Sequence, residues 1–325
     1  MKKNTFTVDG RVHREHAKLL EKLATAEARV KALEKQRNIA VDALDRARAA
    51  KRHPLPQPLQ RRARCRGDLV RVIFGDTHGC KIDLPAFSAL LGDMKRFDPH
   101  HVVLGGDMLN CGGFLAQHHT LGYVAETAET YEQDVAAANT QIDAIQAAAP
   151  RAQFDYLEGN HEDRVERWAV TQALKNQRDA DFLRRLVSPE TLLDLKRRGI
   201  HYYRRSECHD DLTIPGWIRR GKVYFTHEIS HARNAAAAAV ASTGGNIVFF
   251  HTHRQDFSPL VLPAVGLVAA WNPGCLCQRQ PLWRHTRPTH WTNGYAVQLV
   301  SPSGNFLHIN VLIENGVSLV GNLLK

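Results

Sequence analysis

The sequence lacks a hydrophobic run long enough to cross a bilayer. Its longest apolar stretch, residues 260–271, contains Pro263 and falls short of the roughly 20 residues that a membrane-spanning helix needs. Polar residues follow Met1, so the apolar core of a secretory signal is absent. These absences argue against a membrane protein and against export, and they predict a cytoplasmic location.

Cysteine is scarce, with six among 325 residues. The cysteines are scattered, except for Cys275 and Cys277, so they do not form the framework of a disulfide-stabilised secreted domain. A reducing compartment fits this usage. The spacing of the pair also differs from that of the usual zinc-binding cysteine motifs.

The scarcity of acidic residues is confined to the N-terminal part of the chain. The whole chain has a net charge of +10, yet residues 1–66 alone hold 18 Lys and Arg against 7 Asp and Glu. Such a basic arm could bind a polyanion such as nucleic acid. It could equally be a solvated helix followed by a basic linker, and the sequence leaves both interpretations open.

Residues 12–48 are predicted to form one long helix. Apolar residues recur there at alternating steps of four and three, the coiled-coil spacing, and His16 and Arg37 interrupt the seam. We favour pairing with a second copy of the chain, because no other apolar helix has a matching length. The alternative is that the seam packs on the chain's own body. Prolines exclude a helix over residues 53–66, which are predicted to be a linker.

Residues 67–325 are expected to form a separate domain with an α/β pattern. Strands alternate with helices in its first half, and an amphipathic helix is predicted over residues 84–97. The part after Gly199 is mostly strands. This order predicts two facing mixed β-sheets flanked by helices, a four-layer α-β-β-α sandwich, preceded by the long N-terminal helix.

Polar side chains follow several predicted strands, at the point where each strand ends. Acidic, amide and imidazole groups at strand tips are held rigidly and stay open to solvent, as a metal site requires. Oxygen and imidazole donors without thiolate suit Mn²⁺, Fe or Zn²⁺. There are more donors than one ion needs, so two ions sharing one carboxylate are expected. The residues are Asp76, His78, Asp107, Asn160, His161, His227, His251 and His253.

Five short motifs carry a resemblance to a known family. In chain order they read Gly-Asp-Thr-His-Gly, Gly-Gly-Asp-Met-Leu-Asn, Gly-Asn-His-Glu, Thr-His-Glu and His-Thr-His, within residues 75–253. The set and its order resemble the calcineurin-like metallophosphoesterase superfamily. The resemblance covers most of the body and none of residues 1–66.

The resemblance implies a role for each motif residue. One cation would take Asp76, His78 and His253, and the other would take Asn160, His227 and His251, with Asp107 bridging the two. Mn²⁺ is the expected ion, with Fe, Zn²⁺ or Ni²⁺ as alternatives. A hydroxide held between the ions would attack phosphorus. His161 would face the leaving-group oxygen, as a general acid or as a charge stabiliser.

Four further residues lie close to the motifs in the sequence and compete for or extend these assignments. His231, four residues after His227, is a rival for the same ligand position. Glu162 is expected at the start of a helix, where the helix dipole favours an acidic side chain. Arg164 and Arg254 flank the motifs and are candidates to hold a substrate phosphate, although surface ion pairs would explain them as well.

One position departs from the phosphoprotein phosphatases of this superfamily. Those proteins have an Asp three residues after the bridging Asp, followed by Arg-Gly, whereas this chain has Asn110 followed by Cys111-Gly112. An amide at residue 110 could orient His161 but could not stabilise its charged form as a carboxylate would.

The sequence therefore predicts a metal-dependent phosphoesterase. Phosphodiester substrates, either nucleic acid (a nuclease) or nucleotide, are favoured over phosphomonoesters and phosphoproteins. A nucleic-acid-binding scaffold, in which the phosphoesterase body serves mainly for binding, is the alternative from another functional class.

Overall fold

The named helices and strands all lie between Leu69 and Ser318. In the computed structural model, the chain divides into two compact units, Met1–Pro56 and Gln57–Lys325. The expected helix over residues 12–48 lies outside the described residues, except for a few isolated helical positions, and so does the expected linker over residues 53–66. The structure describes residues 68–115, 129–175, 179–281 and 288–318, together with Lys18, Lys22, Glu27, Lys31 and Val320.

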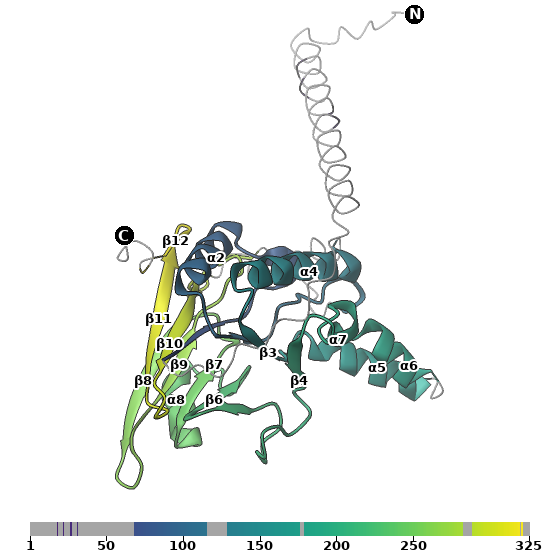
Figure 1. Ribbon diagram of the computed structural model, residues 1–325. Helices are drawn as coiled ribbons and strands as arrows, with labels where there is room; N and C mark the ends of the chain where they lie inside the picture. Colours follow the sequence, from purple (N-terminus) through teal and green to yellow (C-terminus); the bar gives the residue numbers. More distant parts are fainter. Residues whose placement is uncertain are drawn as a thin grey trace, which may run out of the picture. The chain divides into compact units, whose positions relative to one another are not determined.

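A seven-stranded mixed sheet forms one half of the body (Figure 1). Its strand order is β12-β11-β10-β1-β2-β3-β4. The first four strands of the chain run parallel, and the last three are antiparallel to their neighbours. The strands are β1 (Leu69–Phe74), β2 (His101–Leu104), β3 (Gln153–Leu157), β4 (Ile200–Tyr203), β10 (Gly294–Val300), β11 (Phe306–Glu314) and β12 (Val317–Ser318).

A five-stranded sheet faces it, in the order β5-β6-β7-β9-β8. Its inner strands β6, β7 and β9 are parallel, so β6 and β7 end at the same edge. The strands are β5 (Ile218–Arg220), β6 (Val223–Thr226), β7 (Asn246–Phe249), β8 (Gln255–Leu262) and β9 (Gly266–Pro273).

Hydrophobic residues fill three layers of core. Ile73 and Val103 of the first sheet pack with Phe225 and Val248 of the second, which joins the two sheets. A larger cluster lies between the seven-stranded sheet and the helices α2 (Leu84–Phe97) and α4 (Tyr131–Ala148). A third cluster lies beneath α8 (Ala235–Thr243) on the five-stranded sheet. The predicted four-layer sandwich is thereby confirmed.

The connection between β3 and β4 is helical. It contains α5 (Asp163–Lys175), α6 (Ala180–Val187) and α7 (Pro189–Leu192), and two short 3₁₀ turns lie elsewhere, η1 (Gly79–Lys81) and η2 (Gly113–Leu115). Among the described residues, none of the helices has the length and hydrophobicity that a bilayer crossing requires.

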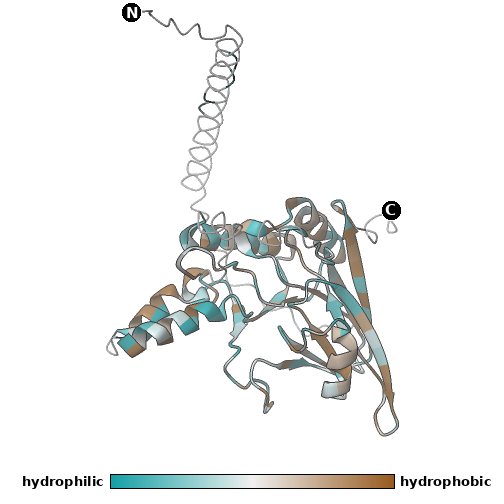
Figure 2. Cartoon of the chain, turned by 180° about the vertical axis from the view of Figure 1, so that it is seen from behind, coloured by the Kyte–Doolittle hydropathy of each residue, from teal (hydrophilic) through white to brown (hydrophobic). Residues whose placement is uncertain are grey.

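Strand periodicity is clearest in the C-terminal half. Along β11, exposed and more buried residues alternate, and Figure 2 shows hydrophobic and hydrophilic segments following one another along the long strands at this edge. The alternation lets β11 pack one face inward while the other faces solvent.

A buried ionic network joins the two sheets at the end where the parallel strands begin. His101 on β2 lies 2.8 Å through its Nε2 from Asp155 on β3, and Arg220 on β5 donates to the same carboxylate at 2.6 Å. Arg71 on β1 donates from Nε to His101 Nδ1 at 2.8 Å. That bond makes Nδ1 an acceptor, so Nε2 carries the hydrogen that His101 donates to Asp155.

Candidate metal centre

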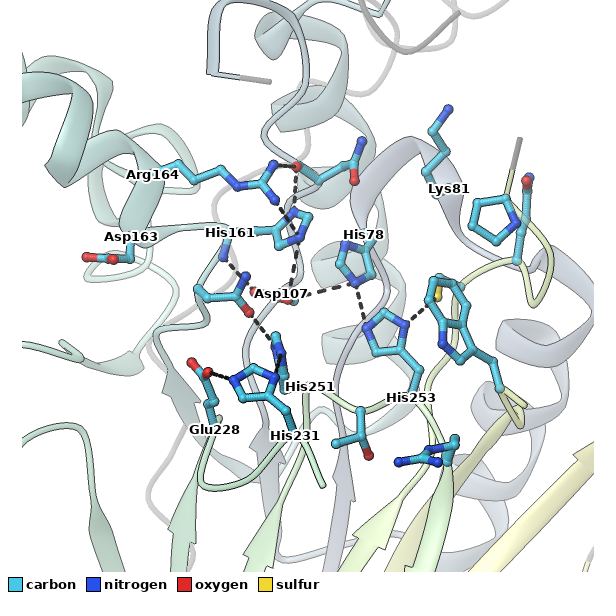
Figure 3. A pocket seen from close by; sticks show the side chains of 18 of the residues that line it. His78, Lys81, Asp107, His161, Asp163, Arg164, Glu228, His231, His251 and His253 are labelled. Carbon is cyan, nitrogen blue, oxygen red and sulfur yellow. Dashed lines mark hydrogen bonds and ion pairs between the residues drawn. The ribbon is translucent and has the colours of Figure 1, made fainter. Parts of the chain in front are cut away.

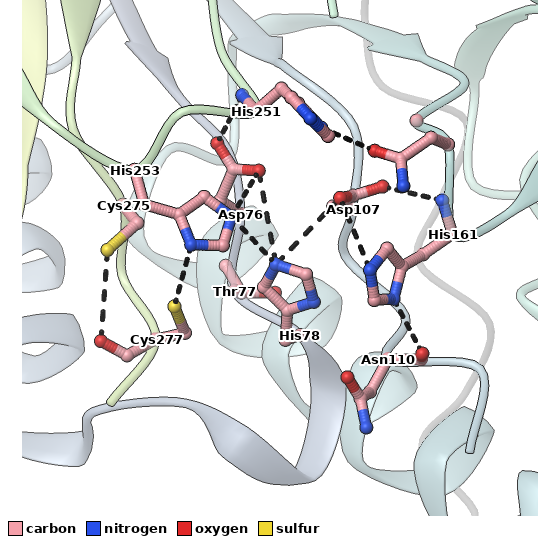
Figure 4. Close-up of polar contacts among 12 residues, drawn as sticks. Asp76, Thr77, His78, Asp107, Asn110, His161, His251, His253, Cys275 and Cys277 are labelled. Carbon is pink, nitrogen blue, oxygen red and sulfur yellow. Dashed lines mark hydrogen bonds and ion pairs between the residues drawn. The ribbon is translucent and has the colours of Figure 1, made fainter. Parts of the chain in front are cut away.

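The motif residues converge because five strands end at one edge of the sandwich. Asp76 follows β1, Asp107 follows β2, Asn160 follows β3, His227 follows β6 and His251 follows β7. The carboxyl ends of parallel strands meet at the same edge of a sheet, and here the edges of both sheets coincide. Side chains far apart in sequence therefore lie beside one another, as Figure 4 shows for Asp76, Asp107 and His253.

The backbone at these strand ends is strained. Five non-glycine residues of the site have left-handed φ values between 50° and 72°. Such a conformation costs of order 1 kcal/mol or more per residue and persists where surrounding structure enforces it, often at functional sites. The residues are Asp76, His78, Asp107, His251 and His253.

The first donor group gathers four buried side chains. His253 Nε2 lies 3.2 Å from Asp76 Oδ1 and 3.1 Å from His78 Nε2. His78 Nε2 is also 3.8 Å from Asp107 Oδ2. One ligand atom from each of these four residues lies within 4.8 Å of the others, close enough to surround a single ion.

The second donor group shares Asp107 with the first. His227 Nε2 lies 3.3 Å from Asp107 Oδ2 and 3.0 Å from Asn160 Oδ1. His251 Nδ1 is 2.6 Å from the same Asn160 oxygen. The rival histidine, His231, lies further out, where it contacts His251.

The residues present fit divalent cations. Asp76 Oδ1 is buried and accepts no hydrogen bond within the described part of the chain, although His253 Nε2 lies 3.2 Å away, and the other oxygen accepts from the His251 backbone N–H at 3.1 Å. A buried carboxylate oxygen that accepts no hydrogen bond is costly, and a cation would satisfy it. The donors are oxygen and imidazole nitrogen, the set preferred by Mn²⁺, Fe and Zn²⁺.

The pKa values of the two donor groups indicate that positive charge beside Asp107 is favourable. Burial would raise the pKa of Asp107, but His227 and His161 outweigh burial and hold this pKa well below its usual range. Burial would lower the pKa of His227, yet the Asp107 carboxylate raises it to about 10. Burial lowers the pKa of His251 to about 4, so its ring is neutral near pH 7 and keeps a lone pair for a ligand bond.

His161 lies beside Asp107 without joining either donor group. Its Nδ1 is 2.6 Å from the backbone carbonyl of Asn110 and its Nε2 is 3.9 Å from Asp107 Oδ2. The expected support from Asn110 therefore comes from its main chain instead of its amide side chain. Arg164 donates from Nη2 to His161 Nε2 at 2.9 Å, so this arginine is placed against the imidazole. Burial lowers the pKa of His161 to about 4.

Two glycines allow the strand tips to approach one another. Gly106 has φ +93°, and a Cβ there would lie 2.8 Å from Gly159 Cα. A Cβ on Gly159 would lie 2.1 Å from Asp107 Oδ1. Side chains at these positions would displace the carboxylate that both donor groups share.

Glu162 has a larger role than its expected position at a helix start. It is 1% exposed, and its carboxylate accepts from the backbone N–H groups of Asp107, Leu109 and Gly159 at 2.9, 3.0 and 3.0 Å. The Tyr156 hydroxyl donates to it at 2.7 Å. Glu162 thus fixes the loop that carries Asp107, through long-range contacts that the local motif does not reveal.

Asp134 does the same for the next part of that loop. From the first turns of α4, its carboxylate accepts from the backbone N–H groups of Asn110 at 2.8 Å and Cys111 at 2.7 Å. It also accepts from Cys80 at 3.3 Å, so one side chain ties together the loops after β1 and β2.

The cysteine pair lies behind the first donor group. Cys277 Sγ is 3.8 Å from His253 Nδ1, the ring nitrogen that faces away from Asp76. Cys277 is buried, as is Cys275, and both are free thiols. The local sequence around Cys277 does not indicate that it lies beside a candidate ligand.

The donor groups open into a cavity of about 1090 Å³ (Figure 3). Basic side chains dominate its charged lining, and Arg254, which also donates to the Ala232 carbonyl at 3.2 Å, lies on its wall. Trp291 lies against the His253 ring, with centroids 4.2 Å apart. The basic residues of the wall are Lys81, Arg164, Arg167, Arg205 and Arg254.

No protein-family model and no curated protein matches the chain. Solved structures do. A conserved uncharacterized protein from Streptococcus pneumoniae, titled a predicted phosphoesterase, has a TM-score of 0.27 and 11% identity over 74% of this chain and 97% of that one. Vacuolar Protein Sorting 29 from Cryptosporidium parvum has a TM-score of 0.31 and 10% identity over 78% and 95%. Vps29 from Chaetomium thermophilum has a TM-score of 0.31 and 10% identity over 74% of this chain and 96% of that one.

The two-sheet architecture places the motif residues along one edge of the sandwich, where the resemblance carried by the motifs leads us to expect them.

Proposed function

We propose that the chain is a phosphoesterase, a hydrolase acting on ester bonds, with a site for two divalent metal ions. The supporting observation is the pair of donor groups that share Asp107, each with its ligand atoms within 4.8 Å. Two cations that share a carboxylate ligand would be close enough to engage a single phosphate group together.

The proposed ligands divide as the resemblance implies. Asp76, His78 and His253 would hold one ion, and Asn160, His227 and His251 would hold the other, with Asp107 common to both. Mn²⁺ is the preferred candidate, and Fe, Zn²⁺ and Ni²⁺ remain alternatives. When bound, the ions would supply Lewis acidity toward the phosphoryl oxygens and lower the pKa of a water.

His161 and Arg164 would act on the leaving-group side of the phosphate. The Asn110 carbonyl takes the Nδ1 hydrogen of His161, which leaves Nε2 directed toward Asp107 and Arg164. Arg164 is 8% exposed and also donates to the Asn110 carbonyl at 3.3 Å, so its guanidinium is held in place. Its charge would stabilise negative charge that develops on the departing oxygen.

A phosphodiester substrate is favoured over a phosphomonoester or phosphoprotein. Among its described lining residues, the cavity has five Lys and Arg side chains but only Asp163 and Glu228 as acids outside the proposed ligands. Such a lining suits an extended polyanion, either nucleic acid or nucleotide. Arg164 and Arg254 are the candidates to hold its phosphates.

The direct test is a substrate panel with metal analysis. Protein purified with Mn²⁺ should cleave bis-p-nitrophenyl phosphate or single- or double-stranded DNA faster than p-nitrophenyl phosphate. Replacing Asp107 by Asn should abolish turnover of every substrate, because both cations lose a ligand. Faster turnover of the monoester would refute the diester preference, and full activity of Asp107→Asn would refute the metal mechanism.

The basic arm supports a second candidate, a nucleic-acid-binding scaffold. Residues 1–66 hold 18 Lys and Arg against 7 Asp and Glu. This candidate predicts salt-dependent DNA binding that is lost from a protein beginning at Gly67, with no metal-dependent turnover. The same truncation tests self-association through residues 12–48, because a coiled coil predicts a smaller oligomer after its removal.

A further inference from the structure

His251, one of the proposed ligands, contacts another side chain through the ring nitrogen that faces away from the site. His227 shows the more common arrangement: its Nδ1 lies 2.7 Å from the backbone carbonyl of Gly105, which fixes the hydrogen on that nitrogen. His251 instead has another side chain there, because its Nε2 lies 3.1 Å from Nδ1 of His231. The two rings meet edge to face, with centroids 4.6 Å apart.

The contact extends into a chain of polar groups (Figure 3). His231 Nε2 lies 2.5 Å from Glu228 Oε1, and Glu228 in turn forms an ion pair with Arg205. The backbone N–H of Arg205 donates to Glu158 at 2.7 Å. This series of polar contacts therefore extends from the end of β4 to the ring of His251.

We propose that His231 and Glu228 are positioning residues that hold His251 in the tautomer needed to bind a cation. An ionised carboxylate only accepts, so the His231 hydrogen lies on Nε2 and its Nδ1 is an acceptor. His231 Nδ1 then takes the hydrogen of His251 Nε2. The lone pair of His251 is left on Nδ1, the nitrogen that lies 2.6 Å from Asn160 Oδ1 in the second donor group.

This inference rests on the proposed metal site, and it excludes a third ion at the same place. Glu228, His231 and His251 offer ligand atoms within 4.8 Å of one another, as a metal site would. A neutral imidazole has only one lone pair on its ring nitrogens, so His251 cannot serve ions on both sides. The observed pairing assigns that lone pair to the side of Asn160 and Asp107.

The test is calorimetric titration of the full chain with Mn²⁺ after removal of metal by a chelator. Wild-type protein should bind two ions. His231→Ala should weaken one of the two by about 10- to 100-fold and leave the other unchanged, as loss of a group that orients a ligand does. His231→Asn places an amide oxygen close to the position of Nδ1, so it should restore most of the affinity.

Two further variants distinguish the loss of the His231–Glu228 contact from a general loss of structure. Glu228→Gln should weaken the same ion in wild-type background and have no additional effect in His231→Ala, because the two residues act in series. His290→Asn is the matched control, since His290 is exposed on the same cavity wall and is expected to leave both affinities unchanged. His231 is itself 68% exposed through its side chain, so its variants should fold, which circular dichroism can verify.

Each contrary outcome has a distinct meaning. Equal Mn²⁺ affinities in wild type and His231→Ala would overturn the positioning role, as would failure of a folded His231→Asn to recover binding. A third ion in wild type that disappears in His231→Ala would also overturn it. If wild-type protein bound no Mn²⁺ at all, the proposed function itself would fail, whatever the variants did.

Discussion

Glu162 shows how much of the site depends on one side chain that touches no candidate cation. Its two oxygens accept four hydrogen bonds, three of them from the backbone around Asp107 and Gly159. A buried carboxylate with this many donors is a rigid support for a loop. The side chain thereby sets the position of the aspartate that both donor groups share.

Replacing Glu162 by Gln should therefore destabilise the protein. The amide NH₂ cannot accept, so donors on one side of the group would lose their partner, at a cost of about 3 kcal/mol in the free energy of unfolding. Urea denaturation of metal-free protein measures this loss. Glu166→Gln, in the helix α5 that begins just after Glu162, removes only half-exposed ion pairs with Arg184 and Arg204, and it should cost under about 1 kcal/mol. Equal losses in both variants would contradict the assigned role.

At the scale of the element, α4 both caps itself and organises the loops of the site. Thr130 and Gln133 form a capping box at its N-terminus, and Asp134 binds the backbone after β1 and β2. These two functions can be separated by mutation.

We expect Thr130→Ala to cost about 1 kcal/mol and to leave Mn²⁺ affinity unchanged, because only the cap is lost. Asp134→Asn should weaken Mn²⁺ binding as well, because an amide cannot accept from three backbone donors on both of its ends. Calorimetry and urea denaturation of both variants check this. The assignment fails if Asp134→Asn binds Mn²⁺ as wild type does.

Regular elements were predictable where their periodicity is strong. The helix expected over residues 84–97 is α2, and the part after Gly199, expected to be mostly strands, begins with β4. Strand β8 was missed because Pro259 lies in it. A proline is tolerated there because β8 is the edge of its sheet and its missing N–H leaves no inner partner unsatisfied. Helix α8 was missed because its run of alanines has no alternation of polar and apolar residues.

The candidate ligands could be proposed from sequence because each follows a strand within a short motif. What the sequence could not give are the supports, since Glu162, Asp134 and Cys277 act through residues distant in the chain. Nor does a motif distinguish a main-chain from a side-chain contact, which is why the role expected of the Asn110 amide belongs to its carbonyl.

For the whole molecule, the network of Arg71, His101, Asp155 and Arg220 predicts sensitivity to acid. Burial lowers the pKa of His101, and although burial would raise the pKa of Asp155, its bonds to His101 and Arg220 hold it below the usual value. For both groups the unfolded chain binds protons more readily, so stability falls as pH falls. The loss begins near the unfolded histidine pKa of about 6.5 and continues below the unfolded aspartate pKa of about 4.

Urea denaturation of metal-free protein at pH 8, 7, 6 and 5 measures this dependence. One histidine of this kind contributes up to about 1.4 kcal/mol per pH unit between its unfolded and folded pKa values. His101→Gln retains a donor toward Asp155 but does not titrate, so its stability should fall less steeply between pH 6.5 and 5. An identical slope would show that His101 is not a source of the effect.

Metal removal should lower the thermal stability of the whole sandwich, because the proposed ligands come from both sheets. A ligand at 100 times its dissociation constant stabilises the folded state by about 2.7 kcal/mol, so Mn²⁺ should raise the Tm by roughly 5–10 °C. Thermal unfolding with Mn²⁺ and with a chelator measures the shift. Asp107→Asn is the control, and its Tm should respond little to Mn²⁺.

The pairing of β1 with β10 also has a consequence for synthesis on the ribosome. Leu69 lies opposite Val300 in that pair, although more than two hundred residues separate them in the chain. The sheet around β1, the strand that leads to Asp76, therefore cannot be completed until β10, one of the last strands, has been translated. Until then one edge of β1 is unpaired, and an unpaired strand edge makes the nascent chain prone to aggregation and in need of chaperone protection.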